Sequence, residues 1–203
     1  SRKFTATMNC LILDAMGVIF QSADDVAELL IPFILEHTEA FDAEPNQQDV
    51  IQSAYLAASL GQISADQFWH QLNTPAELED RYLALHSLNS GVLELLTLAK
   101  ASGIPVWCLS NDLGRWSSKL RHRLGVENYL AGSIISGDVG ARKPDRSIYE
   151  LLVKRSGCEA RNMLLLDDRE QNVIAAQNVG IESILFTPQK GFNQAKLWLS
   201  EHA

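Results

Sequence analysis

Apolar residues gather in short continuous runs that alternate with longer amphipathic segments along most of the chain. Continuous apolar runs of about four to eight residues are typical of strands buried on both faces of a sheet. Amphipathic segments that end at a glycine are typical of helices. The runs predict strands at 8–13, 104–109, 163–166, 183–186 and, more weakly, 133–135, with helices at 91–102, 146–156 and 170–179. This alternation predicts an α/β fold with a parallel sheet and right-handed crossovers.

The stretch from residue 21 to 89 breaks that alternation, because it contains no strand-like run. Helical spacing instead predicts helices at 23–37, 47–60, 65–72 and 76–85. Pro32 lies inside the first of them, where it either kinks the helix or marks an early break. The simplest arrangement is an all-helical cap domain at 21–89, inserted into a core made of residues 1–20 and 90–203.

The amino-acid composition limits which binding partners and which cellular compartment we expect for the protein. The 203 residues carry 17 Lys and Arg against 25 Asp and Glu, a net charge of −8, which disfavours nucleic-acid binding. The longest apolar stretch falls short of the roughly 18 residues that a membrane span needs, and the polar N-terminus does not resemble a signal peptide. The three cysteines, Cys10, Cys108 and Cys158, fit no metal knuckle, and two of them fall in apolar runs. We therefore expect a cytoplasmic protein without membrane or nucleic-acid partners.

Polar side chains follow several of the predicted strands, at the edge where open α/β sheets place their ligands. Asp14 ends the first strand, and Gly17 permits a sharp turn just after it. Ser110 and Asn111 follow the second strand. Each of these features, taken alone, is compatible with an ordinary polar turn.

Two further features carry charge. Lys143 stands immediately before Pro144 at a predicted helix start, where it either reinforces an anion site or is a solvated surface lysine. Asp167 and Asp168 follow four apolar residues, and two adjacent carboxylates there are costly without a cation. Oxygen ligands of this kind suit Mg²⁺, although Arg169 offers a purely structural counter-ion.

Taken together, these features resemble a known family. DAMGV, LSN, RKPDRSIYELL and LLLDDREQNVIAAQNVGI are similar, in order and spacing, to the four motifs of the haloacid dehalogenase-like hydrolase superfamily. The resemblance covers residues 10–186 and is to subfamily I members, which carry a helical cap between the first and second motifs. It implies a Rossmann-like core and a phosphatase that acts on a small phosphorylated metabolite.

The resemblance also implies a magnesium site. Asp14 and Asp168 would bind Mg²⁺ directly, helped by the main-chain carbonyl of Met16. Asp167 would act through a metal-bound water, and Asn172 would orient the loop around the metal.

For the chemistry, the resemblance implies that Asp14 is the nucleophile and forms an aspartyl-phosphate. Ser110 and the main chain near Asn111 would hold the phosphoryl oxygens. Lys143 would neutralise charge between the nucleophile and the phosphate.

The chain departs from the family pattern at Met16. Most phosphatases that it resembles have a second Asp there, which protonates the leaving group, and a thioether cannot transfer a proton. Three interpretations follow. The chain is a phosphatase with another proton source, a weak or non-catalytic binding protein, or a dehalogenase-type hydrolase; the retained Asp167-Asp168 pair argues against the last.

Side chains of the cap are candidates for contacts with the leaving group. Tyr82 is one such candidate. Phe68 and Trp69 are expected to pack the cap core, and Trp116, just after the second motif, is expected to pack its own helix. The histidines His37, His70 and His86 are weaker candidates, the last two as replacement acids. The substrate's identity and the oligomeric state do not follow from the sequence.

Overall fold

A computed structural model describes residues 7–38 and 46–203 of the chain. Residues 1–6 lie outside it, so the expectation for the extreme N-terminus stays a prediction. Within the described residues the strands form one five-stranded parallel sheet in the order β3-β2-β1-β4-β5. The strands are β1 (Cys10–Leu13), β2 (Val106–Ser110), β3 (Gly132–Ile135), β4 (Met163–Asp167) and β5 (Glu182–Leu185). The predicted α/β class with a Rossmann-like parallel sheet is confirmed.

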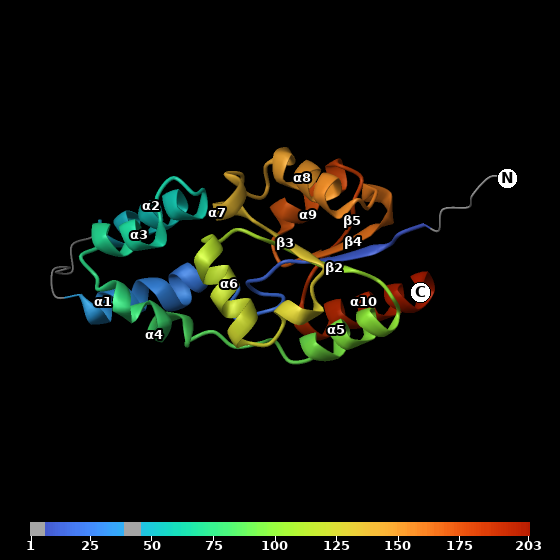
Figure 1. The fold of residues 1–203 in the computed structure, drawn as a ribbon, viewed down its shortest axis with the longest axis horizontal. Helices are drawn as coiled ribbons and strands as arrows, with labels where there is room; N and C mark the ends of the chain where they lie inside the picture. Colours follow the sequence, from blue (N-terminus) through green and yellow to red (C-terminus); the bar gives the residue numbers. More distant parts are fainter. Residues whose placement is uncertain (1–6, 39–45) are drawn as a thin grey trace.

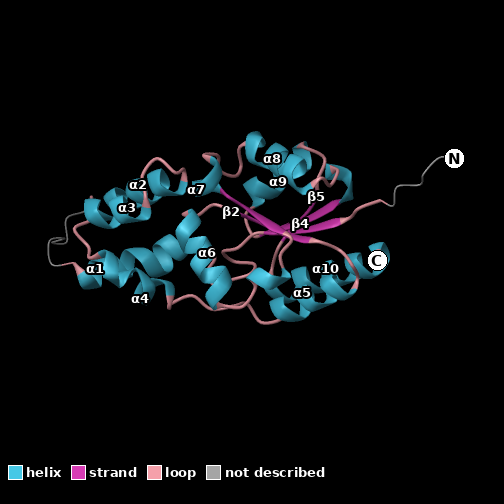
Figure 2. Ribbon diagram, viewed as in Figure 1, coloured by secondary structure: helices cyan, strands magenta, loops and turns pink. Residues whose placement is uncertain are grey.

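Helices cover both faces of the sheet (Figures 1 and 2). Helices α5 (Val92–Ala101) and α10 (Pro188–His202) pack against one face, and α8 (Arg146–Ser156) and α9 (Glu170–Asn178) against the other. Helix α6 (Gly114–Arg123) follows β2, and the short helix α7 (Ser136–Val139) follows β3. Both lie toward the carboxyl ends of the strands (Figure 1). Two 3₁₀ turns, η3 (Glu127–Tyr129) and η4 (Ala160–Asn162), precede β3 and β4.

The central strand β1 shows why these residues form a sheet with two covered faces. Successive side chains of a strand point to opposite faces. Leu11 and Leu13 belong to the core under α5 and α10, whereas Cys10 and Ile12 pack with residues of α8 and α9. All four are fully buried, which explains the unbroken apolar run in the sequence.

Residues 21–89 supply a group of helices at one end of the molecule, beyond the carboxyl ends of the strands (Figure 1). We call this group the helical segment. The chain enters and leaves it side by side: Gln21 N donates to Ser87 O, and Asn89 Nδ2 donates to Val18 O at 2.9 Å. Its elements are η1 (Val26–Leu30), α1 (Ile31–His37), α2 (Gln47–Ser59), α3 (Ala65–Gln71), η2 (Ala76–Leu78) and α4 (Glu79–Leu83).

A buried carboxylate joins the helical segment to α6. Glu79 is 2% exposed, and its two oxygens accept from Trp69 Nε1, Trp116 Nε1, Arg115 Nη2 and Lys119 Nζ. We call this set of residues the Glu79 cluster. Burial raises the pKa of Glu79, but the four donors outweigh burial, and the net pKa lies below its usual value. The carboxylate is therefore fully partnered and stays ionised.

The sequence pattern missed some elements. Helix α10 was not predicted, although Pro188 at its start and the spacing of Phe192, Ala195 and Trp198 are typical of an amphipathic helix. The helix predicted at 23–37 begins as a π-helical turn, and the α-helix starts only at Ile31. Pro32 lies in the first turn of that α-helix, where the π-helical turn gives way to the α-helix.

Across residues 7–38 and 46–203, we find no helix with both the length and the apolar character that a membrane crossing requires.

Candidate active site

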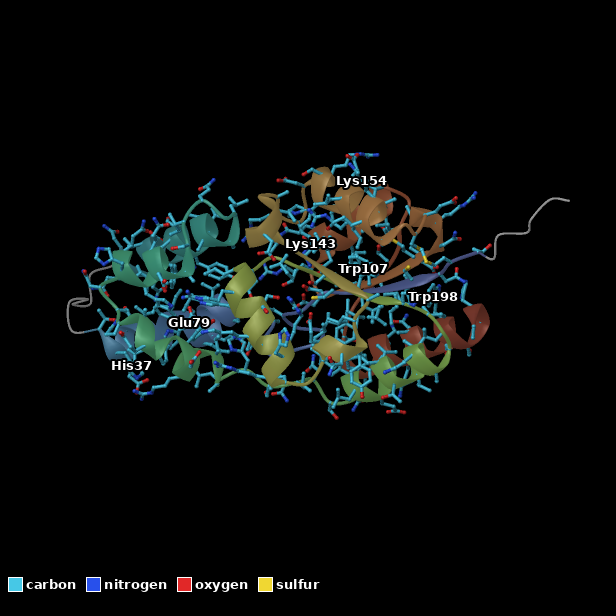
Figure 3. All side chains as sticks on the ribbon, in the orientation of Figure 1. His37, Glu79, Trp107, Lys143, Lys154 and Trp198 are labelled. Atoms are coloured by element: carbon cyan, nitrogen blue, oxygen red, sulfur yellow. The ribbon has the colours of Figure 1, made fainter. Side chains whose placement is uncertain are left out.

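The predicted motifs converge on the ammonium group of Lys143, at the carboxyl ends of β1, β2 and β4. Lys143 Nζ donates to Asp14 Oδ1, Asp167 Oδ2 and Leu109 O, each at 2.8 Å. Lys143 is 4% exposed and Asp167 is fully buried, so water screens these ion pairs little. Figure 3 shows Lys143 where the sheet meets the helical segment. We call Lys143, Asp14, Asp167 and Asp168 the Lys143 cluster.

The charges of this cluster do not balance. Burial raises the pKa of Asp14 well above its usual range; Lys143 opposes that shift, and Asp167 adds to it. Burial likewise raises the pKa of Asp168. Burial lowers the pKa of Lys143, but Asp14 and Asp167 outweigh it and leave a net rise. Lys143 is therefore charged at neutral pH, while additional positive charge would favour the ionised forms of Asp14 and Asp168.

The same carboxylates form a group suited to a metal ion. One oxygen each of Asp14, Asp167 and Asp168 lies within 4.8 Å of the others. Among the described residues, the buried Oδ1 of Asp168 has no hydrogen-bond partner. An orphaned carboxylate oxygen beside two further hard oxygen donors fits a divalent cation such as Mg²⁺.

Gly17 permits the close approach of Asp168 to the turn after β1. Its φ of +83° favours glycine, and a Cβ there would overlap the Asp168 carboxylate. The glycine in DAMGV thus serves both the turn and the acidic group.

Two asparagines hold the cluster in place. Asn111 Nδ2 donates to Lys143 O at 2.9 Å, and Lys143 N donates to Asn111 Oδ1 at 2.8 Å. Asn172 Nδ2 donates to both oxygens of Asp167. The Asn111 side chain is thus engaged with Lys143, and the neighbouring Ser110 is buried.

A cavity of about 250 Å³ opens over these residues. The core contributes Asp14, Ser110 and Lys143 to its wall, together with Met16 at the position that breaks the family pattern. The helical segment closes the other side. Further residues of the wall, which sequence reasoning did not single out, are Ala23, Asp24, Asp25, Val26, Gln52, Tyr55, Leu56, Arg142 and Gln171. They follow no strand and share no spacing, so only the fold brings them to the cavity.

The aromatic and histidine candidates of the segment do not line this cavity. Phe68 and Trp69 are fully buried and pack with Trp116, as expected, and the fully buried Tyr82 also packs there. His70 is exposed. His37 stacks on Phe33 of its own helix. His86 is buried and reaches the cavity only through Asp25, whose Oδ2 lies 3.6 Å from His86 Nε2.

The cysteines behave as core residues. All three are buried and free. Burial raises the pKa values of the Cys10 and Cys108 thiols to about 12, so both remain protonated at neutral pH. None of the three lines the cavity.

The fold and the site define an α/β protein with a carboxylate–lysine cluster at the carboxyl edge of its sheet. The profile of the haloacid dehalogenase-like hydrolases matches residues 8–180, and the chain belongs to that family.

Curated relatives in the family are phosphatases. The chain is 30% identical over 135 residues to the sesquiterpene phosphatase astK of Aspergillus oryzae, a match that covers 63% of this chain and 69% of that protein. It is 31% identical over 108 residues to a phosphoglycolate phosphatase of Yersinia pestis, covering 52% of this chain and 46% of the relative. The second match therefore spans less than half of the relative's length.

Solved structures share the fold at low identity. A HAD family enzyme, BT-2542 from Bacteroides thetaiotaomicron, superposes with a TM-score of 0.72 and 19% identity, covering 90% of this chain and 95% of that one. The same enzyme has been solved in complex with magnesium and inorganic phosphate; that structure has a TM-score of 0.70 at 19% identity, over 90% of this chain and 96% of that one.

Proposed function

We propose that the protein is a Mg²⁺-dependent phosphatase that hydrolyses a small phosphorylated metabolite through an aspartyl-phosphate on Asp14. The observation that carries the proposal is the Lys143 cluster. Asp14 lines the cavity, its Oδ1 accepts from Lys143 at 2.8 Å, and it shares a metal-suited group of oxygens with Asp167 and Asp168.

The donor set suits Mg²⁺. Asp14, Asp168 and the main-chain carbonyl of Met16 would hold the ion, with Asp167 contributing through water. When bound, the ion would supply the positive charge that the cluster lacks and would neutralise phosphoryl oxygens. The magnesium and phosphate complex of the distant structural relative BT-2542 is compatible with this assignment.

The chain's own residues divide the remaining work. Asp14 attacks phosphorus and displaces the leaving group, which converts one difficult displacement into two easier ones. Ser110 and the main chain of Asn111 orient the phosphoryl oxygens. Lys143 stabilises the charge that develops between nucleophile and phosphate, and it is already fixed by Asp167 and Asn111.

The size and enclosure of the cavity favour a small substrate. The cavity holds about 250 Å³ and is bounded by the helical segment, which would act as a cap that excludes water during the reaction. On this proposal residues 21–89 form the cap and residues 1–20 with 90–203 the core. The names of the relatives, which include phosphatases of phosphoglycolate and of phosphorylated carbohydrates, support a phosphorylated small molecule.

The test is Mg²⁺-dependent release of inorganic phosphate from aryl and acyl phosphates. We expect turnover that EDTA removes, that added Mg²⁺ restores, and that is lost in Asp14→Asn. Turnover that persists in EDTA would exclude the metal-dependent reading. Binding of inorganic phosphate without any turnover would favour a non-catalytic protein, and halide release from a haloacid would favour a dehalogenase.

A further inference from the structure

The proposed reaction lacks a proton source on the core side of the cavity. Departure of an alkoxide is slow unless an acid protonates its oxygen, and that help is typically worth about 10²–10⁴-fold. Met16 occupies the wall beside Asp14 and has no proton to give. A replacement acid therefore has to come from another part of the wall.

Asp25 of the helical segment lies on that wall. The residue is only 6% exposed. Its Oδ2 accepts from Tyr82 Oη at 3.5 Å and lies 3.6 Å from His86 Nε2. Asp25 is therefore a buried carboxyl group that is held on one side by the segment and borders the cavity.

The surroundings of His86 place a ring nitrogen beside Asp25. His86 Nδ1 is 3.1 Å from Leu83 O, and because a carbonyl oxygen only accepts, Nδ1 must carry a hydrogen. In a neutral ring Nε2 then presents a lone pair toward Asp25, and Nε2 has no hydrogen-bond partner in the described part of the chain. A hydrogen bond between Nε2 and the carboxylate needs a hydrogen on one of the two atoms, so the geometry favours a hydrogen held between Asp25 and His86.

A second buried carboxyl group, that of Asp112, lies near Asp25. Burial raises the pKa of Asp112 well above its usual range, and the charge of Asp25 adds to the shift. Tyr55 Oη donates to Asp112 Oδ1 at 3.2 Å. The titratable and charged groups around Asp25 are thus His86, Tyr82, Asp112, Tyr55 and, farther along the wall, Asp24 and Arg142.

We infer that Asp25 is the general acid and base of this site, supplied by the helical segment in place of the residue that Met16 replaces, and that His86 positions it. The inference rests on the proposed phosphatase function. In the first step Asp14 bonds to phosphorus, the bond to the leaving oxygen breaks, and the Asp25 proton passes to that oxygen. In the second step the Asp25 carboxylate takes a proton from water. The water oxygen bonds to phosphorus, the bond to Asp14 breaks, and Asp25 is protonated again.

The test compares benzyl phosphate with 4-nitrophenyl phosphate, which are similar in shape but differ in leaving group. Benzyl alkoxide needs a proton to leave, and 4-nitrophenolate does not. In Asp25→Asn we expect kcat on benzyl phosphate to fall by about 10²-fold or more. On 4-nitrophenyl phosphate the variant keeps a stoichiometric burst of nitrophenolate and then turns over slowly, because the water has lost its base.

The matched control is Glu28→Gln, which removes an exposed carboxylate of the same segment that does not line the cavity. It should change either rate by no more than about twofold. Adding Met16→Asp to Asp25→Asn should restore turnover of benzyl phosphate, which a misfolded variant could not do. His86→Gln should lower kcat on benzyl phosphate with little change in KM and with the nitrophenolate burst intact, since Asp25 then loses the ring that holds it.

The outcomes separate this inference from the proposed function. Wild-type kcat on benzyl phosphate in Asp25→Asn would overturn the role of Asp25 while leaving the phosphatase proposal intact. An equal loss on both esters, burst included and not restored by Met16→Asp, would also overturn it. If the wild type gives neither burst nor turnover with either ester, the phosphatase proposal itself fails, and the inference fails with it.

Discussion

The Lys143 cluster and the Glu79 cluster are opposite solutions to burying charge. In the Lys143 cluster, one cation donates hydrogen bonds to two carboxylates, those of Asp14 and Asp167. A third carboxylate, that of Asp168, lies beside them, and its Oδ1 has no partner among the described residues. Glu79 is one carboxylate that receives four donors. The pKa values of Asp14 and Asp168 are raised, whereas that of Glu79 is lowered. Figure 3 shows Lys143 at the junction with the sheet and Glu79 within the helical segment.

This difference in partnering predicts that one cluster serves ligand binding and the other serves the stability of the fold. A carboxylate group short of positive charge is poised for a cation and a substrate, and it costs the folded state free energy until they bind. A fully partnered carboxylate contributes to the fold and has nothing left to offer a ligand. Substitutions in the two clusters should therefore have opposite consequences.

The largest effect is expected for Asp14→Asn. Loss of the nucleophile should lower phosphatase activity by about 10⁴-fold or more. Because the change removes one of three crowded carboxylates, the metal-free variant should be at least as stable as the wild type to urea unfolding. A dead variant that is also clearly destabilised would mean that Asp14 serves the fold as Glu79 does.

Mg²⁺ binding should depend on Asp168. We expect Asp168→Asn to weaken Mg²⁺ binding by about 10–100-fold in isothermal titration, since the variant loses a charged ligand. Saturating Mg²⁺ at about 100 times its Kd should stabilise the wild type by about 2.7 kcal/mol. At the same concentration the variant should keep only about 0.4–1.4 kcal/mol of that gain. An equal thermal shift in Asp168→Asn and wild type would place the ion elsewhere.

Glu79→Gln should have the reverse profile. The variant leaves Arg115 and Lys119 without their buried partner, although both side chains are partly exposed and retain some hydration. We expect the free energy of unfolding to fall by about 1–3 kcal/mol. At a temperature where the variant is folded, kcat should remain near wild type. Asp80→Asn is the control, because Asp80 is an exposed neighbour that also accepts from Lys119. The free energy of unfolding of this variant should hardly differ from that of the wild type.

The smallest effect is in the pH dependence of stability, and its sign differs between the clusters. The Glu79 pKa is lowered from 4.5 in the folded protein, so its stabilisation is present above that value and is lost as pH falls through the lowered pKa. The Asp14 pKa is raised from 3.8, so its contribution is favourable only at low pH and is lost as pH rises.

Urea titrations of metal-free protein between pH 3 and pH 7 test both signs. The deficit of Glu79→Gln should shrink toward pH 3, and the advantage of Asp14→Asn should grow toward pH 7. Parallel pH curves for wild type and Glu79→Gln would show that Glu79 does not titrate differently on folding.

The sequence predicted the parts of the fold and site that local patterns determine. Fully apolar runs marked the strands, and Asp14, Asp167 and Lys143 could be grouped because the carboxyl ends of parallel strands meet at one edge. The roles assigned to them remain proposals. Contacts that depend on tertiary packing could not be read in advance. Asp25 and His86 contact each other although they are 61 positions apart in the sequence, and Glu79 and Trp116 although they are 37 positions apart. No periodic pattern in the sequence links either pair.

The central claim is that Asp14 forms the covalent phosphoryl intermediate. The most direct measurement is an acid quench of the Mg²⁺-loaded protein during turnover of 4-nitrophenyl phosphate, followed by peptide mass spectrometry. We predict a phosphoryl group on Asp14 in the wild type, at higher occupancy in Asp25→Asn, and none in Asp14→Asn. Turnover without any phosphorylated Asp14, or with the phosphoryl group on another residue, would contradict the proposal.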